Sequence, residues 1–448
     1  MGKGTSLVYC DHTDIGRRRS NNQDSKAVLP PSNAQQYRTR GWLFLVADGM
    51  GAHAAGEMAS AIAADRVPLV YEKTAQRSPP LALRHSIEQV NGEINAKGEG
   101  TPEFKGMGTT CTVLALLPRG ALVGHIGDSR AYRLRGRMIE QLTRDHSLVW
   151  ELQSAGVQDA AATAPKNIIT RSMGPHPRVE VDIEGPFPVE DADVFVLCSD
   201  GLSGQVADEE IGLLAAELEP RESAAALVGL TLIRGAPDNV TVIVARAGIE
   251  EISKTSPGDE PWPMSNQPTA QPQAAVLPWR MLGVAAVSLF IALLVSPWSD
   301  VPGREWVAAT IGEKLMHPIS VLASGGCVLV FLTTLLIACI GFLPAAPASV
   351  RVLMPGKQIG KGPYRSYDCT PSENLLEGIV TSIESAADGL AGLDREKTVG
   401  VLLSVRRHVA EHQFHEAVVA AAEAIKIYTK TVHHSRSGDT TRSRPAQP

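Results

Sequence analysis

The chain has 448 residues, of which 44% are hydrophobic and 20% are charged, and its formal net charge is −6. This composition excludes a disordered polar chain, and the negative charge argues against a nucleic-acid-binding surface, so no nucleic-acid partner is expected. The six cysteines include no Cys-x-x-Cys pair, which excludes a disulfide framework and the common zinc ribbons and favours a reducing compartment.

Residues 1–248 are predicted to form one mixed α+β domain. Short apolar runs rich in β-branched residues are typical of strands, and alanine-rich stretches between them are typical of helices. Because several strands follow one another and the helices come in pairs, the pattern favours antiparallel sheets over a regular alternation of strand and helix. The predicted strands are Trp42–Val46, Thr110–Leu117, Ala121–Ile126, Asp193–Leu197 and Val240–Ala245, and the predicted helices are Gly56–Glu72, Leu81–Ala96, Asp208–Glu217 and Ser223–Arg234.

A proline-rich linker, residues 249–276, separates this domain from two apolar stretches, residues 277–297 and 319–343. The second stretch contains no Asp, Glu, Lys or Arg, and it is longer than the roughly 20 residues that cross the core of a bilayer. The first is shorter, but Trp279 and Trp298 bracket it as an aromatic belt would. Two membrane helices are therefore predicted, with a buried core helix as the alternative for each.

Joined by a loop over residues 298–318, the two stretches are predicted to form a membrane hairpin. The segment that follows, residues 344–370, is basic near the second span, and cytoplasmic flanks carry an excess of Lys and Arg. An even number of spans then places the N-terminal domain and the C-terminal tail together in the cytoplasm, at an inner or plasma membrane. The basic residues are Arg351, Lys357, Lys361 and Arg365.

The C-terminal part is predicted to be helical again. Residues 371–432 are expected to form a pair of amphipathic helices, Glu373–Leu393 and Arg395–Thr431, divided near Gly392. The polar tail, residues 433–448, is expected to be disordered.

Four acidic clusters lie at the ends of predicted strands in the N-terminal domain. Asp48-Gly49, Asp128 and Asp200 each follow a strand, and Asp238 precedes one. Any one of them has a plain explanation, because Asp-Gly after a strand is common turn chemistry. Four carboxylates at one edge of a sheet core would repel one another unless cations neutralised them, and Mg²⁺ or Mn²⁺ prefers such oxygen ligands.

Seven short motifs occur in one order along residues 1–248. They are Arg19-Ser20-Asn21-Asn22-Gln23-Asp24, Val46-Ala47-Asp48-Gly49-Met50-Gly51, Gly106-Met107-Gly108-Thr109-Thr110, Gly127-Asp128-Ser129-Arg130, Leu142-Thr143-Arg144-Asp145-His146-Ser147, Cys198-Ser199-Asp200-Gly201-Leu202 and Asp238-Asn239-Val240-Thr241. The order and the residues of these motifs resemble those of the metal-dependent Ser/Thr protein phosphatase family, type 2C, in its bacterial style. The resemblance does not extend to the rest of the chain.

This resemblance implies a central antiparallel β-sandwich flanked by paired helices, followed here by the membrane hairpin and the C-terminal helical segment. It implies an enzyme that hydrolyses phosphoserine and phosphothreonine on proteins, with attack by a metal-activated water and no covalent intermediate. The cofactors would be two Mn²⁺ or Mg²⁺ ions, with a third in bacterial members. The partners would be phosphorylated signalling proteins, with a cognate Ser/Thr kinase and its substrates.

The family pattern also assigns roles to individual residues. Arg19 would bind the substrate phosphate, and Arg19 and Asp48 are the expected catalytic residues. Asp48 would bridge two metal ions. The other metal ligands would be Gly49 through its carbonyl, Asp200 and Asp238 directly, Asp24 through water, and Asp128 with Asp200 at the third ion.

The sequence departs from the family pattern at two positions. Gln23 stands where the motif usually has Glu, and the lost charge is expected to weaken metal affinity at most, because Asp24 remains. Met50 stands where many eukaryotic members carry a histidine proposed as general acid, and bacterial-type members share this Met. The segment Thr143–Gly156 resembles the start of the family's mobile flap beside the active site, with a plain capped surface helix as the alternative.

Two rival functions belong to other classes. The first is a catalytically weak phosphoprotein-binding or scaffold module that retains the fold, and the retained acidic residues argue against it. The second is a channel or transporter built on the hairpin, which two spans without an intramembrane ionisable residue make a poor candidate.

Overall fold

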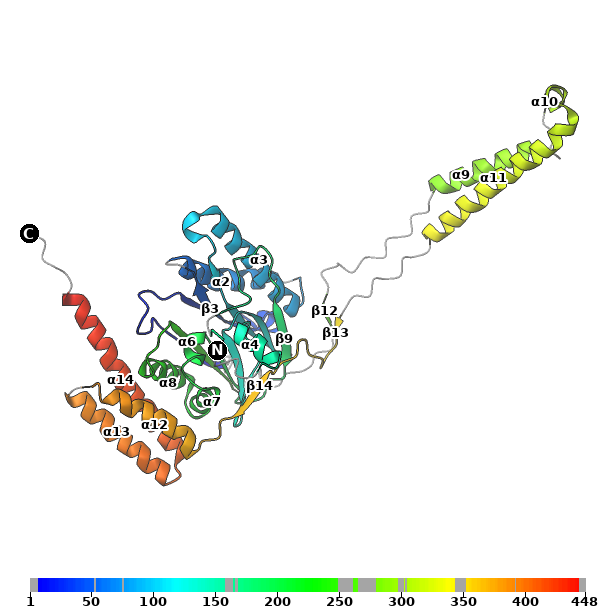
Figure 1. The fold of residues 1–448 in the computed structure, drawn as a ribbon. Helices are drawn as coiled ribbons and strands as arrows, with labels where there is room; N and C mark the ends of the chain where they lie inside the picture. The colour runs from blue at the N-terminus through cyan, green and yellow to red at the C-terminus, as the bar shows by residue number, and fades with distance from the viewer. Residues whose placement is uncertain are drawn as a thin grey trace, which may run out of the picture. The chain divides into compact units, whose positions relative to one another are not determined.

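The computed structural model describes residues 7–51, 54–74, 76–157, 164–165, 168–248, 261–264, 279–296, 302, 304–342, 352–390 and 392–442. The chain forms two compact units (Figure 1). The first comprises Met1–Met264 together with Val352–Pro448, and the second comprises Ser265–Arg351. Most of the predicted linker, residues 249–276, lies outside the described residues.

The first unit is built on two antiparallel sheets. One has the strand order β1-β11-β10-β7-β8-β14, and the other has the order β2-β3-β5-β6-β9 with β4 paired to β3. The strands are β1 (Leu7–Asp14), β2 (Asp24–Leu29), β3 (Trp42–Met50), β4 (Gly108–Thr109), β5 (Cys111–Leu117), β6 (Gly120–Ile126), β7 (Arg130–Arg135), β8 (Met138–Gln141), β9 (Asp182–Phe187), β10 (Val194–Cys198), β11 (Val240–Ala247) and β14 (Arg365–Asp368).

Apolar side chains from both sheets fill the space between them. Phe44 and Leu114 point inward from one sheet, and Phe195 and Ile243 from the other, and all four are fully buried. Burial of this apolar surface is the main force that holds the two sheets together. The predicted antiparallel β-sandwich is confirmed.

Paired helices cover the outer faces of the sandwich (Figure 1). Helices α2 (Ala54–Lys73) and α3 (Pro79–Gly100) pack on the β2–β9 sheet, and α7 (Asp208–Glu217) and α8 (Pro220–Ile233) pack on the other. Their starts follow from local chemistry, since α8 begins at a proline and α7 carries acids in its first turn. The four predicted helices and five predicted strands are present, with ends shifted by a few residues.

The C-terminal segment belongs to the first unit and contains three helices, not the predicted pair. They are α12 (Glu373–Ala387), α13 (Gly392–Ala410) and α14 (Phe414–Arg442). The predicted second helix is interrupted at His412, which has a left-handed backbone with φ of 57°. Residues 433–442, predicted to be disordered, continue α14, and residues 443–448 lie outside the described residues.

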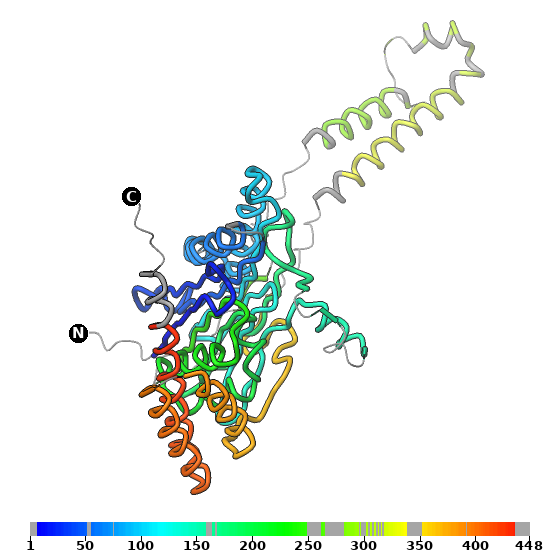
Figure 2. The backbone as a smooth tube through the Cα atoms, turned by 60° about the vertical axis from the view of Figure 1, so that its left-hand side comes forward, coloured from blue at the N-terminus to red at the C-terminus, as the bar shows by residue number. Residues whose placement is uncertain are grey.

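Helix α14 packs along α8 of the sandwich, and Figures 1 and 2 show the two side by side. The close approach depends on Gly229 of α8, because a Cβ there would lie 2.3 Å from Cγ2 of Ile425. Ile425 and Val418 of α14 are fully buried in the core that also contains Leu227. The C-terminal helices therefore form part of the same hydrophobic core as the sandwich.

The chain leaves the first unit and returns to it at neighbouring points. The short strands β12 (Trp262–Pro263) and β13 (Val352–Leu353) pair antiparallel, with Trp262 opposite Leu353. Trp262 is held further by Arg119, whose guanidinium lies 4.0 Å above the indole ring. Residues 265–351 are thus an insertion between two paired ends.

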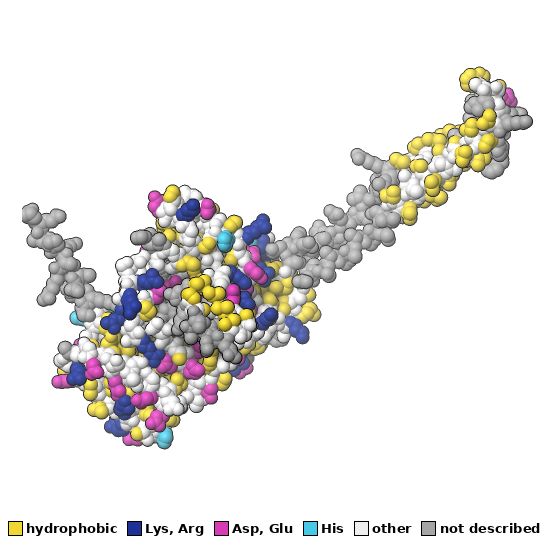
Figure 3. All heavy atoms as spheres, in the orientation of Figure 1, with side chains coloured by type: hydrophobic (Ala, Val, Ile, Leu, Met, Phe, Trp, Pro, Cys, Tyr) yellow, Lys and Arg dark blue, Asp and Glu magenta, His cyan; other side chains and the backbone are white. Residues whose placement is uncertain are grey.

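The second unit contains helices α9 (Trp279–Val295), α10 (Arg304–Ile311) and α11 (Glu313–Phe342). Helices α9 and α11 lie side by side, and hydrophobic side chains cover their visible face in Figure 3. The predicted loop over residues 298–318 is partly helical, because α10 and the first turns of α11 lie in it.

Only one segment of the described residues, Pro318–Ile337, is long and apolar enough to cross a membrane. The apolar part of α9, Leu282–Leu294, is shorter than the roughly 20 residues that a perpendicular span needs. A hairpin with two spans stays a prediction.

Candidate active site

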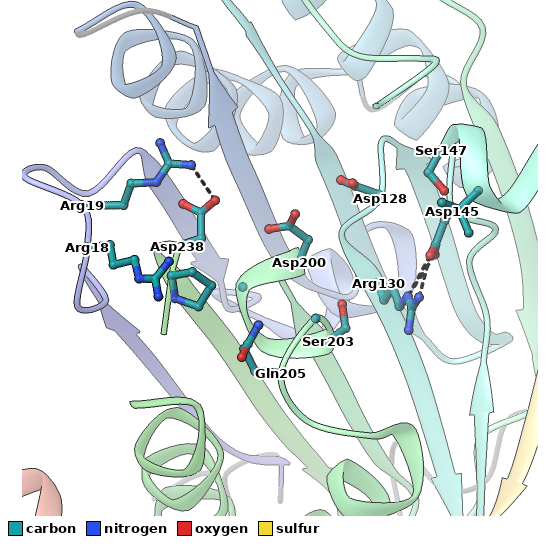
Figure 4. A pocket seen from close by; sticks show the side chains of 14 residues that line it. Arg18, Arg19, Asp128, Arg130, Asp145, Ser147, Asp200, Ser203, Gln205 and Asp238 are labelled. Carbon is teal, nitrogen blue, oxygen red and sulfur yellow. Dashed lines mark hydrogen bonds and ion pairs between the residues drawn. The ribbon is translucent and has the colours of Figure 1, made fainter. Parts of the chain in front are cut away.

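A pocket of about 590 Å³ opens where several strands of the sandwich end (Figure 4). Asp128 follows β6, Asp200 begins the short helix α6 (Asp200–Ser203) after β10, and Asp238 precedes β11. These three carboxylates and Arg19 line the pocket. Four residues that are far apart in the sequence are thereby brought to one edge.

Asp24 and Asp48, on the neighbouring strands β2 and β3, are not among the residues that line the pocket. They face each other directly in the β2–β3 pairing, and the hydroxyl of Ser199 donates to Oδ2 of Asp24 at 2.8 Å. The backbone of Asp48 is fixed by Thr110, whose Oγ1 accepts from the Asp48 amide at 2.8 Å. The two acids are therefore held by the sheet itself and not by a loop.

The acids lie in an environment that disfavours their charge. Burial, with smaller repulsion from Asp200 and Asp238, raises the pKa of Asp24 to about 7. Burial and then Asp200 and Asp145 raise the pKa of Asp128 to about 8.

Asp48 and Asp200 show the same effect. Burial and then the neighbouring carboxylates raise the pKa of Asp48 well above its usual range, and burial also raises the pKa of Asp200. Asp200 therefore lies close enough for its carboxylate to disfavour a charge on Asp48.

The site contains polar atoms without protein partners. Among the described residues, buried Oδ1 atoms of Asp24, Asp128 and Asp200 have no hydrogen-bond partner. Buried carboxylate oxygens left in this state are energetically unfavourable unless a cation binds them. The donor set, carboxylates with a nearby backbone carbonyl at Gly49, is the one that Mg²⁺ and Mn²⁺ prefer.

The side chains are not already gathered around one point. In the described part of the chain, no three His, Cys, Asp or Glu side chains converge as ligands of one ion. Bound cations would therefore have to draw the carboxylates together.

Arg19 lies at the mouth of the pocket and pairs with Asp238. Its Nη2 donates to Oδ2 of Asp238 at 2.6 Å, while the amide of Asn239 donates to Oδ1 at 2.8 Å. The hydrogen bond and charge of Asp238 raise the pKa of Arg19. About half of the Arg19 side chain is exposed, so the guanidinium can reach a ligand in the pocket.

Position 49, inside strand β3, needs a residue without a side chain. A Cβ at Gly49 would lie 2.2 Å from the carbonyl oxygen of Gly56 and 2.5 Å from that of Gln23. The amide of Gly49 donates to the Gln23 carbonyl at 3.1 Å. Gln23 therefore supports the Asp48-Gly49 segment of β3 through its backbone, a role that the change from Glu to Gln leaves intact.

Sequence reasoning missed residues on the other side of the pocket. Arg130 is bound through two nitrogens by Asp145, with Nη2 to Oδ2 at 2.7 Å, and both line the pocket. They occur in the quoted motifs, but spacing gave no sign that they pair. Arg18 also lines the pocket.

The expected flap begins with helix α4 (Leu148–Ser154). Ser147 caps it, since its Oγ accepts from the amide of Trp150 at 3.3 Å, and Ser147 and Val149 line the pocket. Residues 158–163 and 166–167 lie outside the described residues.

Comparisons with known proteins agree with this geometry. Residues 16–228 match the family described as Protein phosphatase 2C. The serine/threonine phosphatase Stp of Listeria monocytogenes is 33% identical over 247 residues, which cover 53% of this chain and 95% of that protein. The chain belongs to the protein phosphatase 2C family. Its N-terminal domain is therefore a serine/threonine protein phosphatase.

Two further relatives of this phosphatase domain cover the same region. The protein phosphatase PhpP of Streptococcus pneumoniae is 35% identical over 247 residues, which cover 53% of this chain and 97% of that protein. The Mycobacterium tuberculosis serine/threonine phosphatase PstP/Ppp, whose structure is solved, has 35% sequence identity to this chain. The match covers 54% of this chain and 99% of the phosphatase, with a TM-score of 0.48.

Proposed function

We propose that this chain is a membrane-tethered phosphatase that uses Mn²⁺ or Mg²⁺ to hydrolyse phosphoserine and phosphothreonine on cytoplasmic proteins. The observation that carries the metal dependence is the cluster of buried acids with unpartnered oxygens on Asp24, Asp128 and Asp200. A protein that kept the fold only for binding would not need carboxylates whose burial raises their pKa values.

Two cations would be held by Asp48 between them, by the Gly49 carbonyl, and by Asp200 and Asp238, with Asp24 acting through water. A third would lie between Asp128 and Asp200. Divalent cations bound there supply Lewis-acid activation of water for attack on phosphorus. The unpartnered oxygens of Asp24, Asp128 and Asp200 support these assignments.

Arg19 binds the phosphate of the substrate in this proposal. Its partner Asp238 is also an expected metal ligand, so a cation on Asp238 would free the guanidinium. A planar guanidinium offers two parallel donors to phosphoryl oxygens and offsets their charge as the bond to the leaving group breaks. Arg19 therefore orients the phosphorus for attack from the side of the carboxylates.

The tether is formed by α9 and α11 as a hairpin with both ends on one side of the membrane. The pairing of β12 with β13 supports this topology, because it keeps the two connections of the insertion adjacent. Helix α9 has 17 residues, about 26 Å at 1.5 Å per residue, so it needs local thinning of the bilayer or its flanking residues to span. The expected partners are a Ser/Thr kinase and that kinase's substrates at the same membrane.

The decisive test is phosphate release from a phosphothreonine peptide by the detergent-solubilised full chain, with EDTA and with added Mn²⁺. We expect release only with Mn²⁺, and none from a variant carrying Asp48→Asn and Asp200→Asn. Equal release from the variant and the wild type would contradict the metal assignment.

Topology is tested separately by protease protection in sealed vesicles. An accessible 298–318 segment on the side opposite to the phosphatase domain supports the hairpin, and cleavage on the same side rejects it.

A further inference from the structure

The segment that returns from the insertion, residues 359–369, is bound along the edge of the phosphatase sandwich. We call it the strap. Its strand β14 pairs with β8, and the amide of Tyr364 donates to the carbonyl of Gln141 at 2.8 Å. At the end of the strap Cys369 is fully buried, and its amide donates to the carbonyl of Arg137 at 2.8 Å. The strap is therefore an integral edge of the sheet that carries Arg130.

A second set of contacts fixes the strap to β9. The carboxylate of Glu184, which is 3% exposed, accepts from the amides of Lys361 and Gly362 at 2.8 and 2.9 Å. It also accepts from the hydroxyl of Tyr364 at 2.7 Å. Since a buried carboxylate is stable only when its oxygens are bound, Glu184 strongly favours the bound strap.

The third set of contacts reaches helix α4. The guanidinium of Arg365 lies 3.9 Å above the ring of Trp150, and Nη2 of Arg365 donates to Oε1 of Gln153 at 2.7 Å. The ring of Tyr364 meets the ring of Trp150 edge-on, with 6.2 Å between the centroids. Trp150 is 9% exposed and is covered by these two strap residues.

Helix α4 in turn forms part of the pocket wall. Ser147 and Val149 flank the start of α4 and line the pocket. Figure 4 shows Ser147 and Asp145 on the side opposite to Arg19 and Asp238. If the phosphate binds between the carboxylates and Arg19, the wall near Ser147 faces the residues of the substrate that surround the phosphorylated one.

We propose that the strap is a positioning element that holds α4 against the pocket and so sets the affinity for phosphorylated proteins. Tyr364 and Arg365 are its positioning residues, and they act through Trp150. The inference rests on the active site proposed above. The strap would also connect residues 265–351 to substrate recognition, because it begins within ten residues of the end of that segment.

The test compares two substrates on the full chain in detergent with saturating Mn²⁺: a phosphothreonine peptide and a small aryl phosphate. A small aryl phosphate fits between the carboxylates and Arg19 without reaching α4. In Arg365→Ala and in Trp150→Ala we expect the KM for the peptide to rise about three- to tenfold, the effect of losing one cation–π pair. The rate with the aryl phosphate should stay within about twofold of the wild type.

Matched variants separate positioning from folding. Arg365→Lys keeps a cation above Trp150 and should recover part of the peptide affinity, whereas Arg395→Ala, which removes an exposed arginine from the same C-terminal segment, should change neither substrate. Amide hydrogen exchange in residues 148–154 should accelerate in Arg365→Ala.

The inference is overturned if the peptide KM is unchanged in both Arg365→Ala and Trp150→Ala, or if both substrates lose rate equally. If both variants keep their activity on the aryl phosphate and their peptide KM is unchanged, only the role of the strap is rejected. If the wild type shows no Mn²⁺-dependent activity at all, the proposed function is rejected.

Discussion

At the pocket, the buried carboxylates of Asp24, Asp48, Asp128 and Asp200 lie near one another, whereas in the layer formed by α7, α8 and α12–α14 buried carboxylates lie beside cations. Repulsion from Asp24, Asp200 and Asp128 adds to burial in raising the pKa of Asp48. In the helical layer, Glu210 binds Arg234 through both oxygens, and Glu217 is bound by Arg137 and by His415. Both regions belong to one compact unit with a shared core.

The difference shows how the same side chain can serve two purposes. A buried carboxylate that is paired with an arginine adds to the specificity of packing and needs no ligand. A buried carboxylate that faces other carboxylates weakens the metal-free fold and gains stability when a cation binds. Unpaired charge therefore marks the functional region more clearly than the number of acidic residues does.

The largest expected effect comes from breaking a pair in the helical layer. Arg234→Ala would leave Glu210, which is 6% exposed, without its cation and would also remove the hydrogen bond to Ser382 of α12. We expect the free energy of unfolding to fall by about 3 kcal/mol. Urea denaturation of the full chain in detergent measures it.

The control for this change is Arg406→Ala, which removes an exposed pair with Glu384 and should lower stability by less than about 1 kcal/mol. Equal losses in the two variants would show that the layer does not depend on its buried pair.

The second prediction concerns Arg19, the residue proposed to bind the substrate phosphate. Arg19→Ala should lower kcat/KM for a phosphothreonine peptide by about a hundredfold, because a bidentate donor to the phosphoryl group is lost. Arg17, two residues before Arg19, donates to the hydroxyl of Tyr428 in α14, so Arg17→Ala should retain activity. Loss of activity in Arg17→Ala but not in Arg19→Ala would contradict the assignment of phosphate binding to Arg19 and would favour Arg17 instead.

The third prediction concerns His125, a histidine buried in the sandwich. Burial and the nearby His146 lower the pKa of His125 to about 3; its Nδ1 lies 2.9 Å from Thr112 Oγ1. The unfolded chain takes up a proton near pH 6.5 and the folded chain does not, so stability is full above pH 6.5 and falls in more acidic solution. The contribution of His125 is up to about 1.4 kcal/mol per pH unit.

His125→Gln should flatten the decline of stability between pH 6.5 and 4.5, as measured by urea denaturation. A slope that is identical in wild type and His125→Gln would contradict the assignment of a neutral, buried imidazole.

The smallest expected effect tests the contact between α8 and α14. Gly229→Ala should lower the free energy of unfolding by about 1–2 kcal/mol, because its Cβ would overlap Ile425. Gly400→Ala has nothing within 4 Å of the new Cβ and should raise stability by about 0.5–1 kcal/mol through helix propensity. Thermal unfolding of the two variants measures this contrast, and a gain in both would show that α14 does not pack closely on α8.

Much of the sandwich could be predicted because its central strands are continuous apolar runs. Strands β3, β5 and β6 are buried on both faces, and that burial is visible in the sequence as β-branched and apolar residues. Strand β14 could not be predicted in this way, since Arg365–Asp368 is polar and becomes a strand only by pairing with β8. The break at His412 was also missed, because no glycine or proline marks it.

The candidate site was predicted for a different reason. Its acids were found from the order of the family's motifs, whereas the direct pairing of Asp24 with Asp48 depends on strand register, which spacing does not reveal. The contact of Arg130 with Asp145 and the cover of Trp150 by Arg365 are tertiary interactions between distant segments. The sequence contains no local signal for either.

The central claim is that the unpaired carboxylates of the pocket form a cation site. Calorimetric titration of the EDTA-treated full chain with Mn²⁺ tests it directly, with the Asp48→Asn, Asp200→Asn variant as control. We predict that the wild type binds at least two ions per chain and that the variant loses this binding while Arg234→Ala keeps it. Absence of binding by the wild type, or the same stoichiometry in the Asp48→Asn, Asp200→Asn variant, would contradict the account.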